Sequence, residues 1–212
     1  MAARTKLDMD PANSTAVVYG DDQTGASFTL AANSVGDGLA RTLSILNNSA
    51  TDHTGKTLAV VGTDADGKAQ TETITGPNSS TTTVGSKHFL TVTSITPSAT
   101  IGADTFDLGV TDVCVSKTIP LDSWSDLGAT VAIDVTGTIA FDVEVTYDSV
   151  NDPSFTWTDQ SSPAWLNATN LTNKTADIIA VLDQGAQACR VIINSYTDTA
   201  ELQAWVTQTQ SR

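Results

Sequence analysis

The chain has 212 residues, of which 40% are hydrophobic, 6% aromatic and only 16% charged, so it is long enough to bury a core and too apolar to be disordered. Its 10 basic and 24 acidic residues give a net charge of −14. Proteins that grip DNA or RNA phosphates need a basic surface, so this charge balance excludes nucleic acid as an expected partner.

No stretch is apolar enough to cross a bilayer, and the first twenty residues lack the apolar core of a secretory signal peptide. A membrane partner and export by that route are therefore not expected. The two cysteines, Cys114 and Cys189, lie far apart with no CxxC spacing. We expect them to be buried free thiols of a protein made in the cytosol, without a disulfide or a zinc site.

Residues 1–22 are predicted to form an N-terminal arm. They mix charges and small residues with Pro11 and one short apolar patch that ends in Val17, Val18 and Tyr19. Such a segment is either a disordered terminus or an extended strap that becomes ordered against a partner. Val17, Val18 and Tyr19 are therefore the first candidate interface residues.

An N-terminal domain is predicted over residues 23–117, and residues 56–76 are its clearest element. Two alternating segments there flank the sequence TDADG at 63–67. Asp and Gly accept the positive φ of tight turns, so the pattern predicts a β-hairpin. Asp64 and Asp66 also resemble the start of a calcium loop, but the later oxygen ligands are missing, which favours a hairpin tip. Further strands are expected at 27–30, 39–47, 87–94 and 106–115.

A C-terminal domain is predicted over residues 118–212. Apolar residues alternate with polar ones over 131–135 and again over 139–147, which predicts two strands with one buried face each. The intervening turn at 136–138 suggests that these strands form a hairpin. Three more strands are expected at 176–182, 189–194 and 201–207.

Between these strands, residues 148–175 form a long polar segment of the kind that often serves as a functional loop. It carries Trp157 and Trp165, which are the second set of candidate interface residues because Trp is favoured at protein interfaces. Together with Trp205, these side chains could instead form a sugar-stacking platform or fill the seam between the two domains.

No segment shows helical periodicity over eleven residues or more. The sequence therefore predicts an all-β protein with two tandem β-sandwich domains, Ig-like or jelly-roll-like, preceded by the extended N-terminal arm.

Residues with catalytic potential are scattered, so no enzyme is expected. His53 and His88 stand outside any metal-ligand cluster, and no nucleophile elbow or phosphate-binding loop occurs. Asp142 and Glu144 share one face of a strand, as a glycosidase pair would, but Asp134 nearby favours a solvated acidic face. Neither a cofactor nor a metal is expected.

Several motifs, in this order, resemble a known family. GKTLAVVGTDADGKAQTETITGP at 55–77, followed by KHFLTVTSITPSA at 87–99, resembles a β-domain that recurs in structural proteins of tailed bacteriophages. VTGTIAFDVEVTYDSV at 135–150 and ACRVIINSYTDTAELQAWVTQ at 188–208 resemble the domain often fused behind it. The resemblance spans roughly residues 20–210. It implies a virion structural protein without catalytic residues, made in the bacterial host cytoplasm.

Three functions follow as hypotheses. The first is a capsid decoration or cement protein that binds the major capsid protein lattice as a homo-oligomer, either a dimer or a trimer. The second is a tail, connector or fibre-base component that docks through residues 148–175 onto other virion proteins. The third is a carbohydrate-binding module, which requires a cleft that pairs Trp residues with carboxylates such as Asp142 and Glu144.

Overall fold

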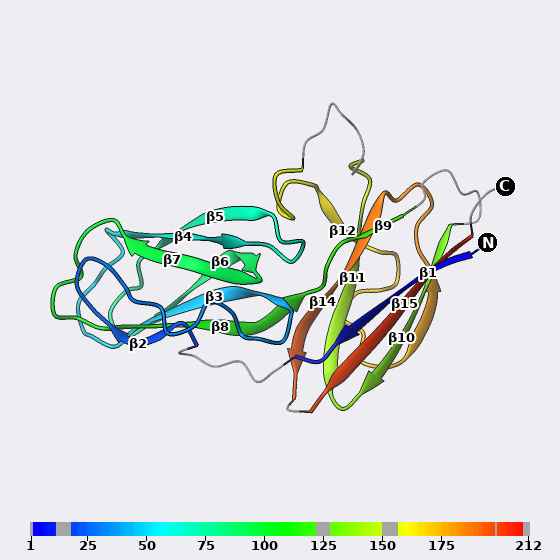
Figure 1. Cartoon of the computed structure of the whole chain (residues 1–212). Helices are drawn as coiled ribbons and strands as arrows, with labels where there is room; N and C mark the ends of the chain where they lie inside the picture. The colour runs from blue at the N-terminus through cyan, green and yellow to red at the C-terminus, as the bar shows by residue number, and fades with distance from the viewer. Residues whose placement is uncertain (1, 12–17, 122–127, 150–156, 198, 210–212) are drawn as a thin grey trace. The chain divides into compact units, whose positions relative to one another are not determined.

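The computed structural model describes residues 2–11, 18–121, 128–149, 157–197 and 199–209 (Figure 1). The chain is 54% strand, and the described residues contain no helix, so the all-β prediction is confirmed. Accordingly, none of these residues belongs to a helix that could span a membrane. The chain divides into unit 1, residues 1–12 with 115–212, and unit 2, residues 13–114.

Unit 1 contains two sets of hydrogen-bonded strands. Sheet A has the order β1-β15-β10-β13. Its strands are β1 (Ala2–Met9), β10 (Ala129–Thr136), β13 (Ile178–Val181) and β15 (Glu201–Thr209). The second set has the order β12-β11-β14, with β9 also paired to β14. Its strands are β9 (Ile119–Pro120), β11 (Ile139–Thr146), β12 (Trp165–Asn167) and β14 (Ala188–Tyr196).

Strand β1 comes from the segment expected to be an arm. It pairs antiparallel with β15 along its whole length, from Ala2 opposite Thr209 to Met9 opposite Leu202. The Met9 side chain is buried, which anchors this edge strand to the interior of unit 1. Unit 1 is thus discontinuous in sequence, because the residues of unit 2 lie between β1 and β9.

The expected hairpin at 131–147 is not present. β10 pairs with β13 and β15, whereas β11 pairs with β12 and β14, so the two strands belong to different sheets. Gly137, at φ +79°, lies in the connecting turn. The buried faces were predicted correctly, since Val131 and Val143 are fully buried. Alternation specifies which face of a strand is buried, but it does not specify the neighbouring strand.

Unit 2 also contains two sets of strands. One has the order β5-β4-β7, and the other has the order β8-β3-β6, with β2 paired to β8. The strands are β2 (Gly20–Gln23), β3 (Ala40–Asn47), β4 (Thr57–Thr63), β5 (Ala69–Thr75), β6 (Thr82–Phe89), β7 (Thr91–Pro97) and β8 (Phe106–Val115).

The predicted hairpin at 56–76 is confirmed as β4 and β5, paired from Thr57 opposite Thr75 to Thr63 opposite Ala69. Its turn is closed by Asp64, whose Oδ1 accepts hydrogen bonds from the backbone N–H groups of Asp66 and Lys68, each at 2.9 Å. The Asp64 side chain is buried, so its carboxylate serves the turn itself.

Two other strand predictions in unit 2 were wrong in detail. Residues 27–30 form a loop, from which Phe28 and Leu30 pack against the core of unit 2. The strand expected at 87–94 is two strands, β6 and β7, interrupted at Leu90. The periodicity located the apolar side chains but not the break, at which the Leu90 N–H donates to the Thr63 carbonyl at 2.8 Å.

Candidate protein interface

The two predicted interface tryptophans lie together at the edge strand β12, of which Trp165 is the first residue. The Trp157 and Trp165 rings pack edge to face with 5.9 Å between their centroids. Trp165 pairs with Thr146 of β11, and its Nε1–H donates to the Gln160 carbonyl at 2.8 Å. Strand pairing and this hydrogen bond therefore fix the orientation of the Trp165 ring.

The ion pair between Arg190 and Glu144 lies against the Trp165 ring. The Arg190 guanidinium carbon lies 4.2 Å from the centre of the Trp165 ring, in cation–π geometry. Arg190 stands opposite Glu144 in the β11–β14 ladder and binds its Oε2 at 2.7 Å through both Nε and Nη2. The expectation of a solvated acidic face was therefore wrong for Glu144. Asp142 also has a partner, the backbone N–H of Asn173.

Two exposed apolar side chains flank this cluster along the chain, and Leu166 projects from the opposite face of β12 to Trp165. Leu166, next to Trp165 on β12, is 55% exposed, and Tyr147, just beyond β11, is 49% exposed. Tyr147 was expected to face inward, but the alternation ends at Thr146, which is buried after the buried Val145. Trp, Tyr and Arg are the residues most enriched at the energetic centres of protein interfaces. We call Tyr147, Trp157, Trp165, Leu166 and Arg190 the tryptophan cluster.

The other predicted interface residues lie elsewhere. Val18 is half-buried against the core of unit 2, and Val17 falls outside the described residues. Tyr19 is fully buried in that core, and its backbone N–H donates to the Leu108 carbonyl at 2.8 Å. Burial away from water raises the pKa of Tyr19 to about 12. Tyr19 thus contributes to packing in unit 2 and presents no surface to a partner there.

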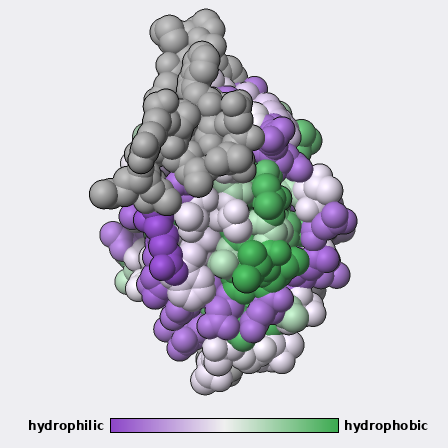
Figure 2. All heavy atoms as spheres, turned by 90° about the vertical axis from the view of Figure 1, so that its right-hand side faces the viewer, coloured by the Kyte–Doolittle hydropathy of each residue, from purple (hydrophilic) through white to green (hydrophobic). Residues whose placement is uncertain are grey.

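A second exposed surface lies on sheet A, where the sequence analysis predicted no interface. Figure 2 shows a hydrophobic patch within a mostly hydrophilic surface on the side where sheet A lies. Ile179 and Val181, on the edge strand β13, are 78% and 64% exposed. Beside them, a shallow groove of about 370 Å³ is lined by Ile133, Ile178, Ile179, Ala132, Asp134, Asp177 and Trp205.

An acidic cluster lies in unit 2, where carboxylate oxygens of Asp21, Asp22 and Asp107 come within 4.8 Å of one another. The pKa of Asp21 is raised by its hydrogen bond with Asp107 and by the repulsion between the two groups. Asp107 Oδ1 also accepts hydrogen bonds from Asn48 Nδ2 at 2.7 Å and from the Asp22 N–H at 3.1 Å. Both donors bind Asp107, which holds this carboxylate in place, and no observation assigns a metal ion to the cluster.

His53 is buried and has partners on both ring nitrogens. Lys56 Nζ lies 2.9 Å from Nδ1, and Asp104 Oδ2 lies 3.0 Å from Nε2. A lysine ammonium only donates, so Nδ1 accepts and Nε2–H donates to Asp104. The ring also packs edge to face on Phe106 at 5.1 Å. With these contacts inside unit 2, His53 has a packing role.

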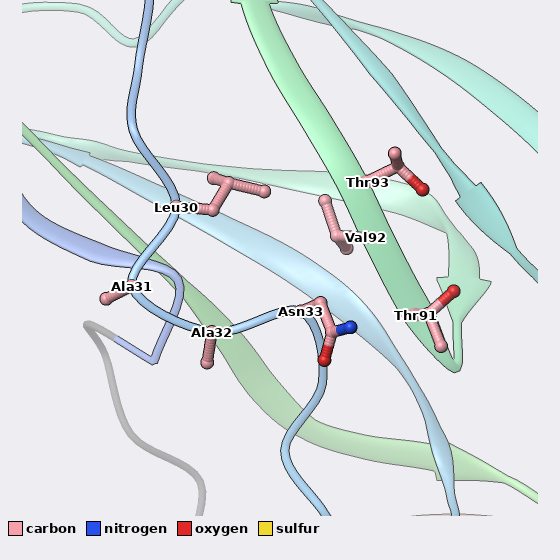
Figure 3. A pocket seen from close by; sticks show the side chains of 7 residues that line it. All are labelled: Leu30, Ala31, Ala32, Asn33, Thr91, Val92 and Thr93. Atoms are coloured by element: carbon pink, nitrogen blue, oxygen red, sulfur yellow. The ribbon is translucent and has the colours of Figure 1, made fainter.

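A larger hollow of about 590 Å³ lies between residues 30–33 and strand β7 (Figure 3). Leu30 and Val92 line it together with small and hydroxyl side chains, and none of its lining residues is charged. The Val92 N–H donates to the Asn33 carbonyl at 2.7 Å, which holds this loop against β7. The lining offers no titratable side chain that could act as a general acid or base or activate its threonine hydroxyls.

Comparison with known proteins gave no match to any protein-family model, any curated protein or any solved structure.

Proposed function

We propose that this protein is a structural component of a bacteriophage virion, most specifically a capsid decoration protein that binds the lattice of the major capsid protein. In this proposal each unit is a β-sandwich, Ig-like or jelly-roll-like, and the protein acts without catalysis. The order of motifs that resembles tailed-phage structural proteins supports it, together with the all-β fold.

The observation that carries the proposal is the tryptophan cluster. It combines Trp157 and Trp165 with Arg190 and two exposed apolar side chains, Leu166 and Tyr147. Arg190 is itself buried and packs against the Trp165 ring, so the accessible part of the cluster is aromatic and apolar. Such a surface suits a protein partner, because tryptophan and tyrosine are enriched among the residues that contribute most of the binding energy at protein interfaces. A subunit bound to a lattice in many copies needs only modest contacts for each copy.

A tail, connector or fibre-base component would use the same cluster, and copy number separates the two roles. The carbohydrate-binding alternative is weaker, because the Arg190 guanidinium already occupies one of the two faces of the Trp165 ring. Glu144 is likewise engaged with Arg190 rather than directed to a ligand.

The first experiment is to count copies in purified particles by quantitative mass spectrometry against the major capsid protein. Hundreds of copies per particle are expected for a decoration protein. A dozen or so copies would assign the protein to the tail or connector, and absence from particles would refute the virion role.

The second experiment tests the cluster itself with the variant Leu166→Asp, added to particles that lack the protein. A charge at this exposed position should leave the fold intact but reduce binding to particles at least tenfold, since it must be desolvated in the contact. The matched control is Val84→Asp, at a half-exposed position on β6 of unit 2. Equal binding by both variants would show that the cluster is not the contact.

A further inference from the structure

Strand β1 lies beside β15 at one edge of sheet A (Figure 1). Among the described residues, no further strand pairs with its other side. It has eight residues, whereas β13 at the opposite edge of the sheet has four. An open edge of this length presents a row of backbone N–H and C=O groups with which another strand can pair.

The hydrogen bonds of sheet A determine which residues of β1 present these groups. In an antiparallel ladder, successive residues direct their N–H and C=O groups to opposite sides. The Leu182 N–H donates to the Ala129 carbonyl at 2.7 Å, so the odd-numbered residues of β10 bond towards β13 and the even-numbered ones towards β15. The registers carry this alternation through β15, so the odd-numbered residues of β1 bond to β15. The backbone groups of Arg4, Lys6 and Asp8 therefore face the open edge.

The same residues carry a charge pattern that is complementary to itself. Together with Asp10, which follows the strand, their exposed side chains give the order cation, cation, carboxylate, carboxylate at every second position. Charged side chains on an edge strand usually keep other strands away. An antiparallel copy of this strand, however, has the reverse order and meets opposite charges, whereas a parallel copy would meet like charges.

We propose that β1 pairs antiparallel with β1 of a second copy of this protein, about a two-fold axis that passes beside Leu7. Lys6 then lies opposite Asp8 of the partner copy, and Arg4 lies opposite Asp10 of the partner copy. All four residues direct their backbone groups to the open edge, so each of these pairs can exchange both backbone hydrogen bonds. The edge is self-complementary, as an interface between identical surfaces requires.

Neighbouring registers lack this agreement. An axis at Lys6 or at Asp8 puts that charge opposite its own copy, and an axis at Thr5 puts Arg4 opposite Lys6 of the partner copy. An axis between two successive residues sets backbone groups that face the open edge against groups that already bond to β15, so the ladder cannot form. The register centred on Leu7 satisfies both the hydrogen bonds and the charges.

The side chains of β1 already have positions that suit this dimer. Lys6 Nζ lies 2.6 Å from Asp8 Oδ1, so in the dimer two such pairs lie side by side with opposite charges facing each other. The Arg4 guanidinium carbon and Lys6 Nζ lie 5.5 and 5.7 Å from the centre of the Trp205 ring, which holds both cations on the outer face of the sheet. On the inner face, the half-buried Leu7 gains contact with its own copy.

The dimer is weak, because a single pair of strands forms the contact. Interfaces of this size belong to the class of weak and transient contacts, so we expect a Kd on the order of 100 µM. The continuous sheet contains four strands from each copy, which is within the usual size of a sheet. This dimer does not depend on the virion role, and it is tested without particles.

The test is sedimentation equilibrium of the full chain from micromolar to millimolar concentration, over which the wild-type protein is expected to change from monomer to dimer. Lys6→Pro removes an N–H that faces the open edge and keeps the hydrogen bonds of β1 to β15. It is therefore expected to raise the dimer Kd at least tenfold with an unchanged circular dichroism spectrum. The matched control is Ile179→Pro, because the Ile179 N–H faces the open edge of β13 by the same alternation. This control is expected to keep the wild-type Kd.

Exchange of charges between two chains tests the register. Lys6→Asp puts a carboxylate opposite Asp8 of the partner copy, and Asp8→Lys puts an ammonium opposite Lys6 of the partner copy. Each variant alone is expected to raise the Kd at least tenfold. In an equal mixture, each chain meets opposite charges on the other, so a heterodimer with a Kd close to that of the wild type is expected. A change in the stability of the monomer alone cannot produce this recovery.

Three outcomes would overturn the proposal. The first is a wild-type protein that stays monomeric to millimolar concentration. The second is a dimer that survives Lys6→Pro, which would indicate a different contact or an exchange of β1 onto β15 of the second copy. The third is a mixture of the two charge variants that associates no better than either variant alone.

Discussion

The buried ion pair between Asp37 and Arg41 allows a quantitative prediction for unit 2. The Arg41 side chain, on β3, is fully buried and that of Asp37 is 2% exposed, with 2.6 Å between Nη2 and Oδ2. Arg41 Nη1 also donates to the Thr111 carbonyl at 3.3 Å, and Asp37 Oδ1 accepts the Leu39 N–H at 3.1 Å. Asp37→Asn keeps the shape of the side chain but removes its charge.

The expected loss follows from the burial of the arginine. Removing one partner of a buried pair costs about 3–5 kcal/mol, because the remaining charge is left in an apolar environment. The asparagine oxygen still accepts hydrogen bonds, so about 3 kcal/mol is expected. With a urea m-value of about 1–3 kcal/mol/M, the unfolding midpoint of unit 2 should fall by roughly 1–3 M.

Urea unfolding followed by two probes measures this change. All four tryptophans, at 124, 157, 165 and 205, belong to unit 1, so tryptophan fluorescence reports unit 1 while circular dichroism reports both units. Asp37→Asn should move the circular dichroism transition of unit 2 and leave the fluorescence transition in place.

A double-mutant cycle completes the experiment. Arg41→Met combined with Asp37→Asn removes both charges, so the double variant should be more stable than Asp37→Asn alone. If Asp37→Asn lowers the stability by less than about 0.5 kcal/mol, or if the two changes are simply additive, the guanidinium does not depend on Asp37 and the reasoning is refuted.

Three further predictions follow. Tyr19→Phe should change stability by less than about 1 kcal/mol at pH 7, since the buried hydroxyl has no hydrogen-bond acceptor or donor among the described residues. The folded-state pKa of Tyr19 is raised from 10 to about 12, so wild-type unit 2 should lose stability between these pH values, and pH-dependent unfolding of Tyr19→Phe should lack that loss. Val143→Asp buries an unpaired charge and should abolish the tryptophan-fluorescence transition of folded unit 1; an unchanged melt would contradict the burial. Burial raises the pKa of Cys114 and Cys189 to about 12, so neither thiol should react with Ellman's reagent until urea unfolds the protein, and rapid labelling at pH 8 would contradict this.

The structural features that were predicted correctly are those determined by residues close together along the chain. The β4–β5 hairpin follows from its Asp and Gly turn, and the buried faces of β10 and β11 follow from their alternation. The pairing of β10 with β15 rather than β11 depends on contacts between residues that are distant along the chain. Strand β1 shows the same limit, since its charged sequence gives little sign of a strand until β15 lies beside it.

Some residues of the candidate interfaces could likewise be identified from the sequence, and others could not. Trp157 and Trp165 could be selected from the sequence, because tryptophan is enriched at protein interfaces and these two lie in a long polar segment. Leu166, Ile179 and Val181 could not, because an apolar residue in a strand is exposed or buried according to which strands lie beside it. β12 and β13 are edge strands, so side chains that would be buried in a central strand remain accessible.

The pairing of β1 with β15 has a consequence for how the protein forms during translation. Ribosomes add about 5–20 residues per second, so β1 emerges roughly 10 to 40 s before the strand with which it pairs. All of unit 2 is synthesised in that interval and can fold first. Strand β1 stays without its partner until β15 has been synthesised. Slowing the ribosome within residues 115–200 should therefore prolong the lifetime of a state with unit 2 folded and unit 1 incomplete. During that time β1 is free to pair with β15 of another molecule.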